Sequence, residues 1–95
     1  MFTGIIKDSG IVKKIARGEN SLLLSIQCNL KNIIIGDSIS VNGICLTLTA
    51  LENNLLAFDV SSESIARSNI GALSLSEKVN LEPALTISDR LSGHF

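Results

Sequence analysis

The residues best placed to do chemistry lie between Gly36 and Thr49, in the stretch GDSISVNGICLTLT. On both sides of an Asn-Gly pair, hydroxyl-bearing residues and one cysteine alternate with aliphatic residues. Hydroxyls bind polar ligands through hydrogen bonds, and a thiol becomes a nucleophile once it loses its proton. Such a row is either an ordinary solvated strand face or a surface that meets a polar ligand. The row consists of Ser38, Ser40, Cys45, Thr47 and Thr49.

A second polar segment runs from Asp59 to Ser64, with the sequence DVSSES. A strand that leads into a helix N-terminus presents free backbone N–H groups beside these hydroxyls, which suits a polyhydroxylated or anionic ligand. Capping of the helix by Ser61 explains the same residues equally well.

The other reactive residues form no recognisable site. Cys28 has no reactive companion and is expected to be structural, while Cys45 needs a positive neighbour to lower its pKa before it reacts readily. His94 is the only histidine and supports no catalytic triad. The carboxylates form no convincing acid–base pair in the sequence, and no spacing indicates a metal site.

The elements that position the polar row can be derived from its turn. Asn42-Gly43 between two alternating runs predicts a hairpin with a two-residue type I′ turn. The register then pairs Ser38 with Thr47 and Val41 with Ile44, and opposed residues share a face. The polar row therefore lies on one side of the hairpin. The opposite side should face the core and carries Ile39, Val41, Ile44, Leu46 and Leu48.

Short strands and one short helix are expected around this hairpin. Alternation and turn residues predict strands over 1–6, 10–17, 21–27, 55–60 and 78–85, and the second hairpin strand reaches about Leu51. Pro83 makes the last strand an edge strand or marks its end. Ser61 reads as the N-cap of a helix over roughly 62–69, with Gly71 just past its end. This pattern predicts a closed or nearly closed antiparallel barrel.

Composition indicates one domain over 1–95 that is long enough to bury roughly 60–70% of its unfolded surface. The net charge of −1 and the three aromatic residues, all Phe, argue against a nucleic-acid partner. No apolar run approaches the length of a transmembrane helix, so we expect no membrane insertion. Two cysteines without a leader make a reducing cytoplasm the default location. The mean hydropathy of +0.40 predicts a surface that meets a partner.

Four groups of motifs, taken together, resemble riboflavin synthase, and specifically its N-terminal half. They are MFTGII at 1–6, GDS and VNGICLTLT within 36–49, FDVSSES at 58–64, and VNLE at 79–82 followed by RLSGH at 90–94. Each group is weak alone, but four in this order and spacing are specific and cover essentially the whole chain.

The resemblance implies an all-β fold, a six-stranded antiparallel Greek-key barrel with one short helix. Members of the family have two such barrels and assemble as homotrimers, so the second barrel is absent from this chain. They are transferases of riboflavin biosynthesis that convert two molecules of 6,7-dimethyl-8-ribityllumazine into riboflavin and 5-amino-6-ribitylamino-uracil, without a metal or organic cofactor. The chain alone is then expected to bind lumazine or riboflavin as a homodimer, with weak or no turnover. Any association with lumazine synthase stays open.

The resemblance also implies roles for particular residues. Ser38 and Cys45 would act as nucleophile or proton relay in a four-carbon transfer. Orientation of two stacked rings would contribute much of the catalysis and would need both barrels. The implied ligand-binding residues are Gly4, Ile5, Ile6, Cys45, Leu46, Thr47, Asp59, Val60, Ser61, Ser62, Glu63 and Ser64.

The sequence departs from the family pattern at a few positions. Ser64 and Ser68 stand where the family usually has Thr, a change that keeps the hydroxyl, and Pro83 and Ser92 lie outside the implied pocket. A non-catalytic lumazine or flavin carrier of the lumazine-protein type is the alternative function. Retention of both Ser38 and Cys45 favours the enzyme.

Overall fold

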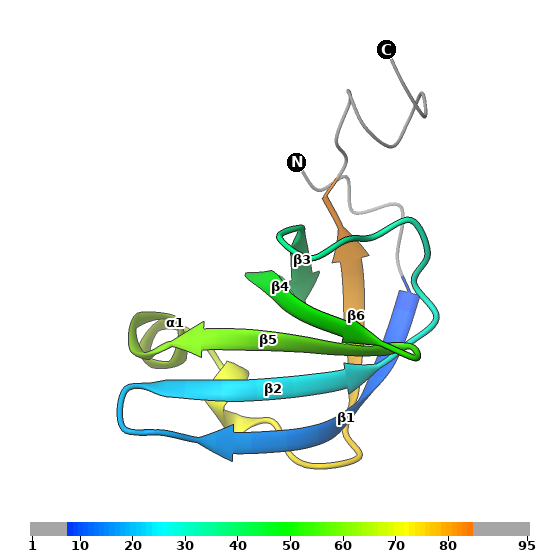
Figure 1. Cartoon of the computed structure of the whole chain (residues 1–95). Coiled ribbons are helices and arrows are strands. Elements are labelled where there is room, and N and C mark those ends of the chain that lie inside the picture. The colour runs from blue at the N-terminus through cyan, green and yellow to red at the C-terminus, as the bar shows by residue number, and fades with distance from the viewer. Residues whose placement is uncertain (1–7, 85–95) are drawn as a thin grey trace.

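The computed structural model describes residues 8–84 of the chain. Within them, six strands close into an antiparallel barrel in the order β1-β2-β5-β4-β3-β6 (Figure 1). The predicted barrel is therefore confirmed, and it is closed. The strands are β1 (Asp8–Arg17), β2 (Ser21–Gln27), β3 (Ser38–Val41), β4 (Ile44–Glu52), β5 (Leu55–Ser61) and β6 (Lys78–Pro83). Helix α1 (Ser62–Arg67) and the 3-10 helix η1 (Ile70–Ala72) lie between β5 and β6.

Most predicted elements appear close to their predicted bounds. The strand over 21–27 is confirmed at both ends, and the strand predicted from residue 10 begins two residues earlier, at Asp8. The helix ends at Arg67 rather than Asn69, because the backbone of Ser68 is extended and the chain then turns into η1, which contains Gly71. The predicted strand over 1–6 lies outside the described residues.

The last strand ends at Pro83, as the missing proline N–H predicts. It is not an edge strand, because β6 pairs with β1 on one side and with β3 on the other. These two pairings close the barrel.

The hairpin of β3 and β4 has the predicted register. Ser38 pairs with Thr47, and Val41 pairs with Ile44. Asn42 (φ 51°) and Gly43 (φ 89°) both have positive φ, as a type I′ turn requires. The turn is fastened to β6, because Asn42 Oδ1 accepts a hydrogen bond of 2.8 Å from the backbone N–H of Asn80, and the Asn42 N–H donates to the Asn80 carbonyl, also at 2.8 Å.

Alternating side chains of all six strands fill the barrel interior, with Phe58 the largest of the fully buried ones. The predicted core face of the hairpin is buried, except that Ile44 is only half-buried. Its polar face is exposed at Cys45, Thr47 and Thr49. Ser40 is only 8% exposed, because β6 lies beside β3 and pairs Glu82 with Ser40. Long-range pairing thus removes one residue from the predicted solvated row.

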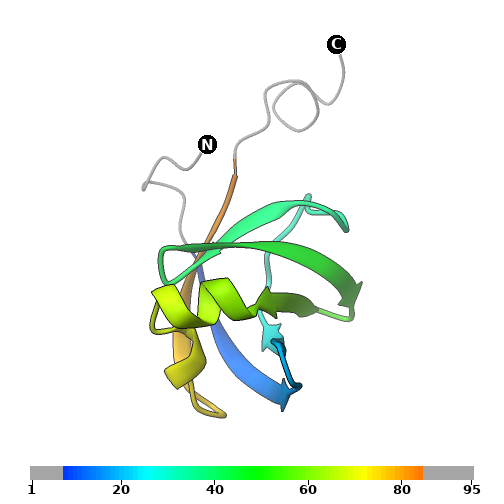
Figure 2. The ribbon, with the colours of Figure 1, turned by 90° about the vertical axis from the view of Figure 1, so that its left-hand side faces the viewer.

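The two cysteines are both free, and they differ in exposure. Cys28 is buried, as expected of a structural residue, whereas Cys45 is exposed on the hairpin. Figure 2 views the barrel from the side where α1 lies in front of the strands, and α1 contacts β2, β5 and η1. Within residues 8–84, neither helix has the length and hydropathy needed to cross a membrane.

Candidate functional site

Two neighbouring strands lose their pairing where they carry polar side chains. The β4–β5 ladder runs from Glu52↔Leu55 to Leu48↔Phe58, so it includes neither 44–47 of β4 nor 59–61 of β5. There β4 pairs with β3 along its other edge, and β5 pairs with β2. Figure 1 shows β4 and β5 diverging toward the end of β5. The backbone groups along the two facing edges can therefore hydrogen-bond a ligand between them.

A β-bulge accounts for this divergence. The β4–β5 register shifts between Leu48 and Ala50, which leaves Thr49 as the extra residue. The Thr49 hydroxyl donates a hydrogen bond of 3.1 Å to the Ala57 carbonyl across the ladder. A bulge bends its strand and increases the local twist, so the part of β4 before it turns away from β5. We call the space between 44–47 and 59–61 the β4–β5 gap.

The side chains that flank the gap alternate in burial. Cys45 and Thr47 are exposed on β4, and Asp59 and Ser61 are exposed on β5. The residues between them, Leu46 and Val60, are buried in the core. The side chains of these two predicted site residues therefore point away from the gap, and only their backbone groups could contact a ligand there.

Ser38 and Cys45 lie on one face of the hairpin but not opposite one another. Ser38 pairs with Thr47, and Cys45 pairs with Ser40, so Ser38 and Cys45 are diagonal neighbours. Diagonal neighbours on adjacent strands lie roughly 7–8 Å apart, too far for a direct hydrogen bond. They cannot form a nucleophile–base pair with each other, and each would act on a ligand separately.

Helix α1 begins directly after the gap. The N-cap Ser61 accepts a hydrogen bond of 3.2 Å from the Ser64 N–H, which confirms the capping interpretation, and its hydroxyl lies 3.3 Å from that of Ser64. Ser62 and Glu63 are exposed and Ser64 is half-buried. Glu63 forms an ion pair of 3.7 Å with Arg67 on the exposed side of the helix, a geometry that contributes little to stability.

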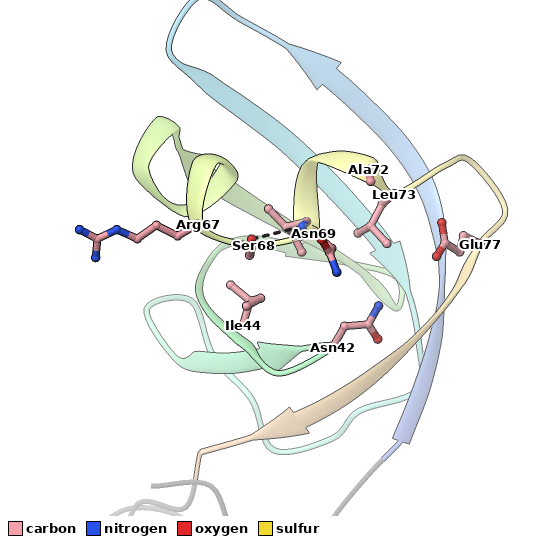
Figure 3. Close-up of a pocket in the computed structure, with 9 residues that line it drawn as sticks. Asn42, Ile44, Arg67, Ser68, Asn69, Ala72, Leu73 and Glu77 are labelled. Atoms are coloured by element: carbon pink, nitrogen blue, oxygen red, sulfur yellow. Dashed lines mark hydrogen bonds between the residues drawn. The ribbon is translucent and has the colours of Figure 1, made fainter.

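A cavity of about 590 Å³ lies between the hairpin turn and the connection from α1 to η1, and Ile44, at one end of the β4–β5 gap, is among the residues that line it (Figure 3). Ile44, Ile70 and Leu73 supply apolar walls, and Asn42 contributes an amide. In Figure 3 the Arg67 guanidinium points away from the other residues drawn. None of the predicted site residues lines this cavity. The sequence gives no signal for it, because its walls come from segments that only the folded chain brings together.

Three of the implied ligand-binding residues lie outside the described residues, and the described part of the chain contains no cluster of metal ligands. Gly4, Ile5 and Ile6 lie outside the described residues, so their contact with a ligand stays a prediction. Within residues 8–84, no group of three or more His, Cys, Asp and Glu side chains could hold a metal ion.

Known proteins are similar to this chain in sequence and in fold. Residues 3–84 match the sequence profile of the lumazine binding domain. Riboflavin synthase of Bacillus subtilis (strain 168) is 39% identical over 97 residues, covering 100% of this chain and 45% of the relative. Riboflavin synthase of Actinobacillus pleuropneumoniae is 38% identical over 96 residues, covering 99% of this chain and 45% of the relative.

Solved structures share the fold of this chain. LumP complexed with riboflavin superposes with a TM-score of 0.85 at 29% identity, covering 96% of this chain and 50% of that chain. LumP complexed with 6,7-dimethyl-8-(1'-D-ribityl) lumazine gives a TM-score of 0.82 at 30% identity, covering 88% of this chain and 49% of that chain. The chain spans about half the length of the curated relatives that it matches. With a profile match over most of its length and a closed six-stranded barrel, the chain belongs to the lumazine-binding domain family.

Proposed function

We propose that this chain binds 6,7-dimethyl-8-ribityllumazine or riboflavin in the β4–β5 gap, as the N-terminal half of a riboflavin synthase. The observation that carries the proposal is the gap itself, where two unpaired backbone edges lie beside the exposed side chains of Cys45, Thr47, Asp59 and Ser61. A pyrimidine edge needs backbone-like donors and acceptors, and a ribityl chain needs hydroxyl and carboxylate partners. LumP and the riboflavin synthases, which share the fold or the sequence, support this choice of ligand.

The fold proposed for the whole family is a Greek key. A Greek key has three consecutive antiparallel strands and a fourth strand that lies beside the first. Counted backwards along the chain, β5, β4 and β3 are three consecutive antiparallel neighbours, and β2 is the fourth strand, which lies beside β5.

The reaction proposed for the full-length protein is a dismutation. One lumazine loses a proton from a ring methyl group, a ring carbon of the second is attacked, and a four-carbon unit passes between them. Riboflavin and 5-amino-6-ribitylamino-uracil together contain all atoms of the two substrates, so no external oxidant or organic cofactor is needed. Ser38 and Cys45, separated across the hairpin face, serve as nucleophile or proton relay at different ligand atoms.

A single barrel supplies only one side of such a reaction. The polar groups around the gap are exposed in this chain, and two rings must be stacked for transfer. We therefore propose a homodimer for the isolated chain, with feeble or undetectable turnover, and a homotrimer for the full-length protein. Two free cysteines fit a reducing cytoplasm as its location.

Binding is tested by titrating riboflavin into the chain and following the quenching of riboflavin fluorescence. We expect saturable quenching at micromolar protein, weakened when Thr47 is replaced by Val and when Asp59 is replaced by Asn. Leu75 is an exposed loop residue outside the gap, so its replacement by Ser should leave the titration unchanged. If the quenching of riboflavin fluorescence by the unmodified chain does not saturate, the proposal is wrong.

A non-catalytic lumazine or flavin carrier is the second candidate, favoured by the similarity to LumP structures. A lumazine turnover assay on the full-length gene product separates the two. For the enzyme, Ser38→Ala and Cys45→Ala should reduce turnover more than binding. Unchanged turnover in both variants would refute their catalytic assignment, and no turnover in the unmodified protein would favour the carrier.

A further inference from the structure

Positive side chains are distributed unevenly around the barrel. Within the described residues, strands β2, β3, β4 and β5 carry no Lys or Arg, whereas β1 carries Lys13, Lys14 and Arg17. The one cation of β6 is Lys78, its first residue, which pairs with Ile11 of β1. In the closed order β1-β2-β5-β4-β3-β6, β4 is three strands away from β1 in either direction. The cationic strand β1 therefore lies on the opposite side of the barrel from β4, which flanks the β4–β5 gap.

Carboxylates, by contrast, lie on both sides of the gap. Asp59 is exposed on β5. On the other side, Glu82 of β6 pairs with Ser40 of β3, and Ser40 pairs with Cys45 of β4. Because paired residues share a face, Glu82 lies on the same face as Cys45, two strand spacings or roughly 10 Å away. A charged group in the gap is therefore near negative charge on both sides.

The other two described cations do not offset this charge. Arg67 forms an ion pair of 3.7 Å with Glu63 on the exposed side of α1, and its guanidinium points away from the other residues drawn in Figure 3. Lys31 comes shortly after Cys28, whose N–H donates to the Asn54 carbonyl at the paired end of the β4–β5 ladder, away from the gap.

The start of α1 does not provide a site for an anion either. Helix N-termini attract anions through their free N–H groups. In α1, however, the Ser61 hydroxyl accepts a hydrogen bond from the Ser64 N–H, and Glu63 already places a carboxylate in the first turn. The surroundings of the gap therefore favour neutral ligand groups that donate hydrogen bonds.

We propose that the gap selects ligands with an unphosphorylated ribityl chain and discriminates against their phosphate esters, with Asp59 as the specificity-determining residue. This inference rests on the proposed function, in which the ribityl chain meets a carboxylate of the gap. Hydroxyl groups donate hydrogen bonds to a carboxylate, whereas a phosphate monoester carries about −1.5 to −2 charges at pH 7 and is repelled by it. Riboflavin and flavin mononucleotide (FMN) differ only in that phosphate, so a comparison of the two isolates its charge.

Parallel titrations of the chain with riboflavin and with FMN test this proposal, because quenching of the ring fluorescence follows both ligands. At low salt we expect riboflavin to bind about tenfold more tightly than FMN, through repulsion between the phosphate and the carboxylates. Salt screens exposed charges, so an increase in NaCl from about 50 mM to about 500 mM should tighten the binding of FMN. The binding of neutral riboflavin should stay unchanged.

Three variants separate the charge of Asp59 from other effects. Asp59→Asn should weaken riboflavin binding but lower the ratio of the FMN and riboflavin dissociation constants severalfold. Thr47→Val, an uncharged change in the gap, should weaken both ligands alike and keep the ratio. Glu52→Gln removes a carboxylate at the paired end of the ladder, where Glu52 pairs with Leu55, and should change neither constant. Residues 55–59 span roughly 13 Å of strand, more than the Debye length of about 8 Å at physiological ionic strength.

The proposal is overturned if FMN binds as tightly as riboflavin or more tightly, if salt weakens the binding of FMN, or if Asp59→Asn leaves the ratio unchanged. Riboflavin still saturates the chain in each of these outcomes, so the proposed function would stand and only this inference would be lost. A chain that binds neither ligand would refute the proposed function, and this inference with it.

Discussion

The two thiols of the chain should differ strongly in reactivity. Cys45 is exposed on the hairpin, whereas Cys28 is buried and burial raises the pKa of its thiol. A raised pKa means that less of the reactive thiolate is present at a given pH, so Cys28 is protected both by its charge state and by its neighbours. We therefore expect a disulfide reagent to modify one thiol per folded chain quickly, and both thiols after denaturation.

The pH dependence and a ligand complete this prediction. The Cys28 thiolate fraction in the folded chain should rise only at a higher pH than that of a free thiol. The slow modification of Cys28 should therefore accelerate only at a higher pH than the modification of a free thiol does. Riboflavin should slow the fast thiol, because Cys45 borders the β4–β5 gap. The variant Cys45→Ser, which should lose the fast phase, identifies that thiol. Equal reactivity of both thiols in the folded chain would contradict the burial of Cys28.

The turn of the β3–β4 hairpin is an element whose stabilisation can be dissected. Asn42 and Asn53 each open a two-residue turn with positive φ, of 51° and 49°, so replacement by Ala strains both turns alike. Only Asn42 also accepts a hydrogen bond from the Asn80 N–H on β6. We expect Asn42→Ala to lower the free energy of unfolding by about 1 kcal/mol more than Asn53→Ala does, measured by urea denaturation. Equal losses would show that the link to β6 contributes nothing to stability.

These elements also show which features follow from sequence alone. The register of the hairpin depends on a turn of two residues, and the N-cap at Ser61 depends on its immediate neighbours, so local chemistry was enough to predict both. The burial of Ser40 was not predictable in this way. It depends on β6, which lies about forty residues further along the sequence and pairs Glu82 with Ser40.

In the candidate site, too, local sequence predicts some features, and pairing between strands determines the others. Alternation placed Cys45 and Thr47 on one exposed face, and the structure confirms that placement. The divergence of β4 from β5 comes from a bulge at Thr49, where no glycine or proline marks an irregular strand. Threonine is favoured in strands, so the sequence around Thr49 predicts regular pairing between β4 and β5. The shape of the site thus depends on pairing between strands, which the sequence of one strand does not determine.

The closed barrel joins the proposed ligand site to the stability of the whole molecule. The β4–β5 gap is formed by two strands whose other edges belong to the closed barrel, and one core cluster spans all six strands. A domain of this kind unfolds as a single cooperative unit. Unfolding should therefore destroy the gap and release any ligand, so that binding and stability are linked.

Riboflavin should raise the melting temperature of the chain, because it binds only the folded state. A ligand that binds only the folded state at 100 times its dissociation constant stabilises it by about 2.7 kcal/mol. For a domain of this size that amounts to a rise of roughly 10–20 °C, measurable by circular dichroism. Ribitol at the same concentration is the control, because it lacks the ring system and should give little shift. A melting temperature independent of riboflavin would contradict binding to the folded barrel, and two separate transitions would contradict a single cooperative unit.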